Sequence, residues 1–435
     1  MNSLKDIVSK KQNKGLRGVI TIPPDKSISH RSLIFAAQTG ARVKISNFSY
    51  GADCRATLEI IKALGCEVDF TDERTLILNA PKSFNAPDKV LDCGNSGTSM
   101  RLLSGMLASR NFNSTLAGDE SLSKRPMKRI IEPLGLMGAK IKSNDFKAPL
   151  EIIGAKLNPI EYFSPISSAQ VKSCILLAGV NTSGVTTVYE KTLSRNHSEK
   201  MFEYLEADIQ TGRDEKGFYT KIQKSKLVPK DIEIAGDISS AAFFMVMAAI
   251  VPNSEIIIKN VGINPTRTGI LDVFDKMSVN YEILNKNIVS NEETGDIKVS
   301  YSPNLKGCEI SGEIIPRLID ELPVIAVLAS AADGQTTVSD AQDLRNKESD
   351  RISALVCGLK KIGVEIEEKP DGFIISGKNK DLKGGVEVET HLDHRLAMSY
   401  FTAGLICRDE ILIKDFNWVN TSFPEFLELF SKISE

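Results

Sequence analysis

The sequence lacks the features that mark several large classes of protein. Its net charge is only −2 over 435 residues, so it has no general electrostatic attraction to nucleic acid or anionic membrane. No run of 18 apolar residues is present, and residues 1–17 are polar and lysine-rich, unlike a secretion signal. The seven cysteines are odd in number and never form a C-x-x-C pair. We therefore expect a cytoplasmic protein with reduced cysteines that binds neither membrane nor nucleic acid.

Motifs for nucleotide and zinc sites are missing as well. The chain has no G-x-G-x-x-G, no Walker A motif and no H-E-x-x-H, and it contains only four histidines. Nucleotide chemistry and a zinc site thus have no support. With a net charge near zero, any anion site must be a local cluster of cations.

A repeated helix pattern organises the chain. Six segments open with small, polar or charged residues and continue into long apolar runs; they begin at Ser27, Asn95, Ser167, Asp237, Asp320 and Asp393. Successive starts lie about 70 to 80 residues apart, which indicates internal duplication. Runs such as 241–251 and 324–332 are apolar nearly all round, as buried helices are. Each run is followed by an alternating strand, an amphipathic helix and further strands.

Six copies of this unit predict an α/β (α+β) protein of two domains with three units each. The buried helices would share a direction, so that their N-termini meet at one face. The first turn of a helix has unpaired N–H groups and the positive end of the helix dipole. N-termini that meet and carry polar side chains therefore form a cleft that favours anions.

Cations lie beside these predicted helix starts. The first start reads Pro23-Pro24-Asp25-Lys26-Ser27-Ile28-Ser29-His30-Arg31-Ser32. A lysine charge and an arginine fork within one turn favour a phosphate or carboxylate ligand. Taken singly, each start is also explained by an ordinary helix cap or a solvated surface. Their joint occurrence indicates an anion site, and the cations concerned are Lys26, Arg31, Arg125, Lys347, Arg351 and Arg395.

Together these motifs resemble the 5-enolpyruvylshikimate-3-phosphate synthase family. The matching stretches are Asp25-Lys26-Ser27-Ile28-Ser29-His30-Arg31, Gly94-Asn95-Ser96-Gly97-Thr98, Lys124-Arg125-Pro126-Met127, Ser168-Ala169-Gln170, Asp320-Glu321, Arg345-Asn346-Lys347-Glu348-Ser349-Asp350-Arg351 and Asp393-His394-Arg395. They stand in the family's order and span nearly the whole chain. The stretch Ser194-Arg195-Asn196-His197 also resembles the family sequence after the third buried helix.

The resemblance implies transfer of the enolpyruvyl group of phosphoenolpyruvate to the 5-hydroxyl of shikimate 3-phosphate, with release of phosphate, in the shikimate pathway to chorismate and aromatic amino acids. It implies an inside-out barrel of two domains, each with three βαβαββ units, that close on substrate. Two chain crossovers would form the hinge between a domain at about 24–236 and a domain of 1–23 plus 237–435. This chemistry requires no metal or organic cofactor. The buried helices suffice for a monomer, which we favour.

Ligand residues follow from the resemblance by motif position. Shikimate 3-phosphate would be held by Lys26, Ser27, Arg31, Ser168, Gln170, Asp320 and Lys347, with Ser167 and Arg195 as further candidates. Phosphoenolpyruvate would be held by Lys26, Asn95, Gly97, Arg125, Gln170, Arg351 and Arg395.

The reaction also needs a base for the 5-hydroxyl and an acid for the methylene carbon, with the roles reversed when phosphate leaves. We expect Asp320 to act as the base, while Glu348 and Lys26 are the best candidates for proton transfer at the methylene carbon. How these three residues divide the acid and base duties stays open.

Two positions bear on affinity. Thr421 stands where many relatives carry a lysine, so either another cation, for example Lys414, compensates or the affinity for phosphate is lower. Relatives with alanine at the position of Gly97 are expected to exclude glyphosate sterically. Gly97 therefore predicts that this site accepts glyphosate.

Two alternative functions are less well supported. The sister enzyme that transfers enolpyruvyl to a UDP-sugar uses a Lys-Asn pair near the N-terminus and a reactive cysteine loop. This chain has Lys26-Ser27 instead and no cysteine around Arg125. A non-catalytic binder of phosphate or RNA ends would show a broad basic face without paired carboxylates. The net charge of −2, together with Asp320 and Glu348, argues against it.

Overall fold

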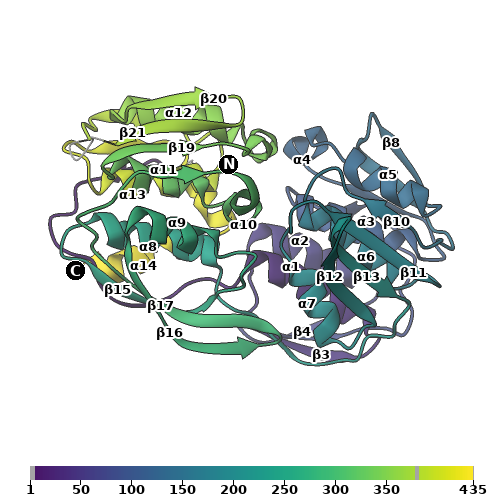
Figure 1. The fold of residues 1–435 in the computed structure, drawn as a ribbon. Coiled ribbons are helices and arrows are strands. Elements are labelled where there is room, and N and C mark those ends of the chain that lie inside the picture. The colour runs from purple at the N-terminus through teal and green to yellow at the C-terminus, as the bar shows by residue number, and fades with distance from the viewer. Residues whose placement is uncertain (1–4, 378–381, 435) are drawn as a thin grey trace. The chain divides into compact units, whose positions relative to one another are not determined.

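The computed structural model describes residues 5–377 and 382–434, which form two compact units (Figure 1). We call them the terminal unit and the central unit. The terminal unit comprises Met1–Pro23, Ala235–Asn287 and Glu293–Glu435. The central unit comprises Pro24–Ile234 and the short segment Ile288–Glu292.

The central unit packs three four-stranded sheets against three buried helices. The buried helices are α1 (Lys26–Gln38), α3 (Gly97–Ala108) and α6 (Ala169–Gly179). The outer helices are α2 (Ala52–Ala63), the short α4 (Glu120–Lys124), α5 (Lys128–Leu136) and α7 (His197–Tyr204). The sheet orders are β14-β3-β5-β4, β6-β7-β9-β8 and β10-β11-β13-β12. Their strands are β3 (Arg42–Ser46), β4 (Glu67–Asp72), β5 (Thr75–Asn79), β6 (Leu91–Asp92), β7 (Ser114–Ala117), β8 (Lys140–Asn144), β9 (Lys147–Ile153), β10 (Glu161–Phe163), β11 (Val185–Glu190), β12 (Ile209–Asp214), β13 (Gly217–Gln223) and β14 (Ile232–Glu233).

The terminal unit repeats this plan. Its buried helices are α8 (Ile238–Ile250), α11 (Leu322–Ser330) and α13 (His394–Gly404). The other helices are α9 (Gly269–Met277), α10 (Ile315–Leu318), α12 (Arg351–Ile362) and α14 (Phe426–Ser434), with 3-10 turns η1 (Gly312–Ile314), η2 (Gln342–Asn346) and η3 (Phe416–Thr421). The sheet orders are β16-β17-β15-β2, β18-β19-β21-β20 and β1-β23-β22. Their strands are β1 (Ile7–Ser9), β2 (Arg17–Thr21), β15 (Glu255–Gly262), β16 (Asn280–Val289), β17 (Glu292–Ser300), β18 (Glu309–Ile310), β19 (Gly334–Val338), β20 (Ile366–Lys369), β21 (Gly372–Gly377), β22 (Val386–Val388) and β23 (Ile411–Ile413).

The strands next to the crossovers depart from the simple repeat. Strand β2 precedes α1 along the chain but pairs in parallel with β15 of the terminal unit, Ile20 opposite Ile258. Strand β14 precedes α8 but pairs in parallel with β3 of the central unit, Ile232 opposite Ile45. Each crossover thus leaves the leading strand in one unit and sends its helix into the other. The last sheet is completed by β1 from the N-terminal region, antiparallel to β23.

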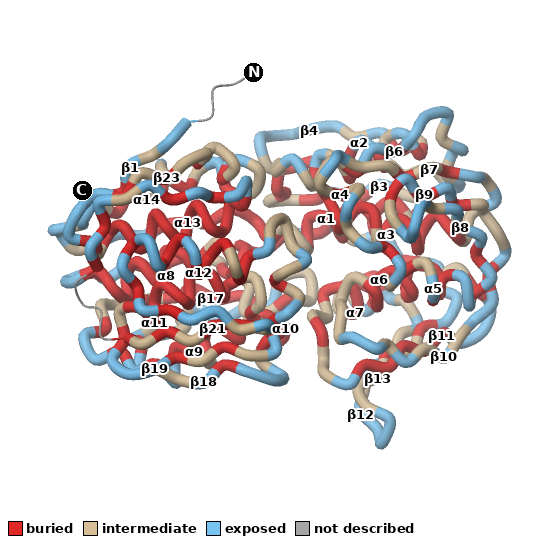
Figure 2. The backbone as a smooth tube through the Cα atoms, turned by 90° about the horizontal axis from the view of Figure 1, so that it is seen from above, coloured by how far each residue is buried: buried red, intermediate tan, exposed pale blue. Residues whose placement is uncertain are grey.

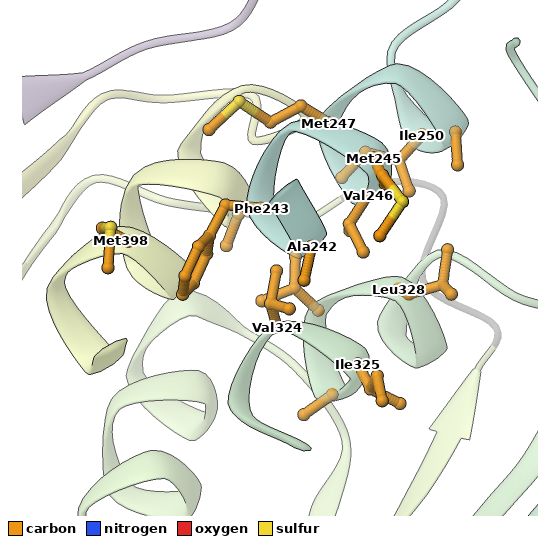
Figure 3. Packing of buried hydrophobic residues seen from close by; sticks show 14 of the residues in the cluster. Ala242, Phe243, Met245, Val246, Met247, Ile250, Val324, Ile325, Leu328 and Met398 are labelled. Atoms are coloured by element: carbon orange, nitrogen blue, oxygen red, sulfur yellow. The ribbon is translucent and has the colours of Figure 1, made fainter. Parts of the chain in front are cut away.

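The core of each unit is built on the three buried helices, as the sequence predicted. Every residue of α8 except Ser240 is buried, and every residue of α11 is buried. Figure 2 shows this burial as red along α8 and α13 in one unit and along α3 and α6 in the other. In Figure 3, Phe243 and Val246 of α8 lie near Val324 of α11, within one continuous cluster. Helices that are apolar all round can be stable only in such a fully covered position.

Two further features concern the cysteines and the length of the helices. All seven cysteines are free thiols; five are buried, Cys308 is partly buried and Cys357 is exposed. Within the described parts of the chain, no helix combines the length and the hydropathy that a membrane span needs.

Close packing of α3 on α6 depends on Gly105. A Cβ atom at this position would lie 2.0 Å from the carbonyl oxygen of Cys174, so the backbone of α6 would have to move. We expect Gly105→Ala to lower the free energy of unfolding by about 1–3 kcal/mol. In the control Gly135→Ala, the new Cβ atom would meet no described atom within 4 Å. Alanine favours helix there, so stability should stay equal or rise by up to about 1 kcal/mol. Urea unfolding compares the variants, and wild-type stability of Gly105→Ala would contradict the prediction.

Candidate functional site

The buried helices of the central unit begin at polar residues, as predicted. Asp25 caps α1 by accepting a hydrogen bond from the Ile28 amide at 2.8 Å, and Ser96 caps α3 through the Ser99 amide at 3.1 Å. Ser168 occupies the N-cap position of α6. The first residue of α1, Lys26, forms an ion pair of 3.1 Å with Asp53 near the start of α2. Lys26 is about a quarter exposed, so its charge remains accessible.

Asn95, Gly97 and Arg125 lie together at the start of α3. Arg125 Nη2 donates to Asn95 Oδ1 at 2.6 Å, and Asn95 Nδ2 donates to Asp119 Oδ2 at 2.8 Å. A Cβ atom on Gly97 would lie 2.8 Å from Arg101 Nη1 and 3.6 Å from Arg125 Nη1. Two guanidinium groups therefore border this glycine, and they give the helix start a local positive charge.

Arg101 is a site residue that the sequence reasoning missed. Its Nη1 donates to Gln170 Oε1 at 2.6 Å, while Gln170 Nε2 donates to Thr98 Oγ1 at 3.0 Å. Arg101 thus fixes the predicted ligand Gln170 and joins the starts of α3 and α6. The sequence could have indicated this role, because Arg101 interrupts an apolar helix run and lies one turn after Gly97.

Arg31 is buried among neutral partners. Its guanidinium donates from Nε to Ser198 Oγ at 2.8 Å, from Nη1 to the Ser27 carbonyl at 3.0 Å and from Nη2 to Ser173 Oγ at 3.0 Å. Burial lowers the pKa of Arg31 to about 10, although the nearby carboxylates, Glu199 foremost, oppose this shift. Arg31 is still charged at neutral pH, and its immediate hydrogen-bond partners carry no negative charge. Such a buried cation favours an anionic ligand.

The two weaker candidates lie around α6 and α7. Ser167 precedes α6, and its Oγ accepts from the Thr192 amide at 3.1 Å. Arg195 lies just before α7, close enough that its charge acts against that of Arg31.

Lys172 was also missed by the sequence reasoning. It is buried in α6 and pairs with Glu190 at 2.6 Å and Glu199 at 2.7 Å. Burial alone would lower the pKa of Lys172, but the two carboxylates outweigh it and the pKa is raised. This buried triad holds α6, β11 and α7 together behind Arg31.

In the terminal unit, Arg351 joins three carboxylates. It opens α12 and donates from Nε to Asp393 Oδ2 at 2.7 Å and from Nη2 to Glu348 Oε2 at 2.5 Å. Its Nη1 lies 3.4 Å from Asp320 Oδ1. Burial would lower the pKa of Arg351, but the three carboxylates prevail and raise it above its ordinary value. Arg351 is therefore a fixed charge around which the carboxylates are arranged.

The other residues predicted in the terminal unit gather around Asp320. Lys347 Nζ lies 3.3 Å from Asp320 Oδ1, and Arg395 Nη1 donates to the Asp320 carbonyl at 3.1 Å. Asp320 and Glu348 keep about 13% and 25% of their side chains exposed, whereas Arg351 keeps 1%. The two carboxylates are therefore partly open to solvent, whereas Arg351 is covered.

A second buried cluster of the terminal unit was not predicted. Arg267 Nη2 donates to Asp237 Oδ1 at 3.1 Å and to Ser239 Oγ at 2.7 Å at the start of α8. The Ser239 hydroxyl also donates to Glu321, the N-cap residue of α11. Only the contacts of the folded chain reveal this cluster, because Arg267 lies far from Glu321 in sequence.

The cation proposed to replace the missing lysine at Thr421 has partners of its own. Lys414 Nζ lies 2.6 Å from Asp6 and 3.9 Å from Glu387. The Asp6 carboxylate, first among these contacts, raises the pKa of Lys414. Lys414 is thus paired with carboxylates before β1 and on β22 of the same sheet.

Comparison with known proteins finds relatives along nearly the whole chain. The family model for EPSP synthase (3-phosphoshikimate 1-carboxyvinyltransferase) matches residues 10–430. A 3-phosphoshikimate 1-carboxyvinyltransferase of Geotalea uraniireducens is 46% identical over 427 residues, which cover 97% of this chain and 98% of that protein. One of Geobacter sp. is 48% identical over 422 residues, 96% of each. The solved EPSP synthase of Acinetobacter baumannii has a TM-score of 0.88 and 40% identity, over 99% of this chain and 98% of that one.

His30 makes the stability of this region depend on pH. Its Nδ1 lies 2.7 Å from Thr57 Oγ1, which lies 2.6 Å from Ser99 Oγ, so α1, α2 and α3 are linked. Burial, opposed by Asp53 but helped by Lys26 and Arg31, lowers the pKa of His30 from 6.5 to about 3. As the pH falls below 6.5, the unfolded chain gains a proton at this residue but the folded chain does not. Stability is therefore lost between pH 6.5 and about pH 3.

We expect His30 to account for about 2 kcal/mol of the unfolding free energy lost between pH 7.5 and pH 5. In His30→Asn, an amide that does not titrate replaces the imidazole near Thr57, so that share of the loss should vanish. Urea unfolding at both pH values measures it. An equal loss in the variant and the wild type would contradict the assignment.

Proposed function

The chain belongs to the EPSP synthase family, and from this premise we propose how its residues divide the reaction. The enzyme transfers the enolpyruvyl group of phosphoenolpyruvate to the 5-hydroxyl of shikimate 3-phosphate and releases phosphate, a step in aromatic amino acid biosynthesis. Each substrate carries a phosphate and a carboxylate. Binding both therefore requires several cations in a site with little water.

The central unit supplies most of the positive charge. For shikimate 3-phosphate we propose Lys26, Ser27, Arg31, Ser168 and Gln170, with Ser167 and Arg195 beside them. Arg31 supports this assignment, because its three observed acceptors are a carbonyl and two hydroxyls. From the terminal unit, Asp320 and Lys347 complete the set.

Phosphoenolpyruvate is assigned to Lys26, Asn95, Gly97, Arg125, Gln170, Arg351 and Arg395. The two guanidinium groups beside Gly97 support the first part of this set. Arg351 already donates to three carboxylates. It can therefore bind the ligand only if Asp320 or Glu348 moves away from it. Asp393, which is fully buried, holds Nε at 2.7 Å and also lies 3.4 Å from Nη2. Arg351 would then meet the ligand with its Nη atoms.

Catalysis requires one proton to leave the hydroxyl and one to reach carbon. We propose that Asp320 takes the 5-hydroxyl proton as the oxygen bonds to C2 of phosphoenolpyruvate. Glu348 or Lys26 gives a proton to C3, which becomes a methyl group in the tetrahedral intermediate. The residue that gave this proton then takes one back from the methyl group, the bond from C2 to the phosphate oxygen breaks, and phosphate leaves with the proton that Asp320 had taken.

The observation that carries this assignment is the set of contacts at Asp320. Four of the predicted residues meet there, because Lys347 and Arg351 contact its carboxylate and Arg395 contacts its carbonyl. The carboxylate that we propose as the base is thus held in place by two cations.

We propose further that the enzyme acts as a monomer in the cytoplasm and folds as two domains, 24–236 and 1–23 plus 237–435. The terminal unit and the central unit support this division into domains. The free thiols are those expected in a reducing compartment.

Removing the charge of Asp320 tests the proposed function. We expect Asp320→Asn to lower kcat for phosphate release by about 10²–10⁴, because the base is lost. Phosphate is measured from shikimate 3-phosphate and phosphoenolpyruvate together, and from each alone, without added metal. Asp343→Asn, in η2 of the same unit, is the matched control and should keep wild-type kcat. A wild-type kcat for Asp320→Asn would contradict the role of Asp320 as the base. Turnover with a UDP-sugar in place of shikimate 3-phosphate would contradict the proposed acceptor substrate.

Gly97 predicts inhibition by glyphosate. We expect the wild type to be inhibited in competition with phosphoenolpyruvate. In Gly97→Ala the new Cβ atom would crowd Arg101 Nη1 at 2.8 Å, so the inhibition constant should rise by about tenfold or more. Initial rates at several concentrations of both compounds measure it. Near-normal wild-type activity in a large excess of glyphosate would contradict the prediction.

A further inference from the structure

The hairpin formed by β16 and β17 is shared between the two units. Its strands lie in a sheet of the terminal unit, but the contacts of its tip, Ile288–Glu292, place the tip in the central unit. Ser290 and Asn291 both have positive φ values, 48° and 66°, as the two central residues of a tight type I′ turn require. The tip is therefore a tight turn whose backbone conformation is defined.

The tip is fastened to α7 by several hydrogen bonds. Asn291 Nδ2 donates to the Lys200 carbonyl at 3.0 Å, and Lys200 Nζ donates to the Asn291 carbonyl at 3.0 Å. Ser290 Oγ accepts from the Glu233 amide at 2.9 Å. These bonds involve both β14 and α7, so the tip is held on two elements of the central unit.

Glu292 makes the buried contact of the tip. One of its carboxylate oxygens lies 2.7 Å from His197 Nδ1, and the two side chains are only 7% and 3% exposed. We assign Nδ1 of His197 as the donor and Glu292 as the acceptor, since a carboxylate without its proton can only accept. This bond fixes the first residue of α7.

The next two residues of α7 support the proposed substrate site. Ser198 accepts from Arg31 Nε and lies 2.6 Å from Ser173 Oγ, the acceptor for Arg31 Nη2. Glu199 pairs with buried Lys172. The start of α7 therefore determines where the guanidinium of Arg31 points.

We propose that Glu292 is a positioning residue for shikimate 3-phosphate: through His197 it holds the start of α7, and thereby Arg31, in the geometry that binds this substrate. The inference rests on the proposed role of Arg31. Glu292 lies outside all the motifs that point to the substrates, and it comes from a hairpin whose strands belong to the other unit.

Two substitutions distinguish a positioning role of Glu292 from an effect of its charge. In Glu292→Ala the acceptor for His197 is lost, and we expect the KM for shikimate 3-phosphate to rise about tenfold, as one lost buried hydrogen bond would cause. The values of kcat and of the KM for phosphoenolpyruvate should change by about twofold or less. Glu292→Gln keeps a side-chain oxygen that can accept from Nδ1, so it should restore most of the affinity.

A purely electrostatic role gives the opposite pattern. Glu292 opposes the positive charge of Arg31, so loss of its charge alone would strengthen anion binding, and both variants would lower the KM for shikimate 3-phosphate. That result would overturn the proposal. An unchanged KM in folded Glu292→Ala would overturn it as well. Glu282→Ala, an exposed carboxylate on β16 of the same hairpin, is the control and should leave all constants unchanged.

Arg31→Lys distinguishes failure of this inference from failure of the proposed function. A raised KM for shikimate 3-phosphate in Arg31→Lys, beside an unchanged one in Glu292→Ala, would refute the positioning role alone. An unchanged KM in Arg31→Lys would refute the role of Arg31 and the inference with it. The double variant His197→Ala/Glu292→Ala should be no worse than the more severe single variant, since both act through one bond. Thermal unfolding of every variant confirms that the protein is folded.

Discussion

In both units, a helix that is buried on all sides needs hydrogen-bond partners for the amide groups of its first turn. Its first amide groups have no partner within the helix and cannot reach bulk water, so at four of the six buried helices the N-cap side chain satisfies one of them, although not at α6 or α11. Asp25, Ser96, Asp237 and Asp393 do so at α1, α3, α8 and α13. The apolar core, which makes each unit stable, thus requires polar residues at one end of its helices. The site residues lie at these ends.

The chemical type of the N-cap residue determines which charged groups lie beside it. A buried carboxylate needs a cation nearby, so Asp393 is paired with Arg351 and Asp237 with Arg267. At α3 the cap is a hydroxyl, and the network through Ser96, Ser99 and Thr57 carries no charge. The arginines near α3 are therefore not neutralised by the cap. One unit combines cations with carboxylates suited to proton transfer, while the other keeps an excess of positive charge for anionic groups.

Sequence reasoning predicted the parts of this arrangement that local pattern encodes. The all-apolar runs identified α8 and α11 as buried, and the spacing of the starts gave the repeat. The exchange of β2 and β14 at the crossovers was not predictable, since strand pairing over more than 180 residues leaves no local signal. Lys172, Arg267 and Glu292 were missed for a related reason: each is buried by partners from other elements, and a lone charged residue in a sequence is usually a solvated one. Arg101 could have been found from its interruption of an apolar run.

Arg31 and Arg351 show that equal burial can prepare an arginine for different tasks. Arg31 donates to hydroxyls and a carbonyl, and its pKa is lowered because burial is not offset by a bound carboxylate. An anionic ligand would supply the missing negative charge. Arg351 is surrounded by three carboxylates that raise its pKa despite its burial, so an anion can reach it only in exchange for one of them. Asp393 is fixed, which leaves Asp320 and Glu348 to be released. Binding of an anion at Arg351 would thereby free one of the carboxylates that the proposed proton transfers require, and it would link recognition of the substrate to the availability of that carboxylate.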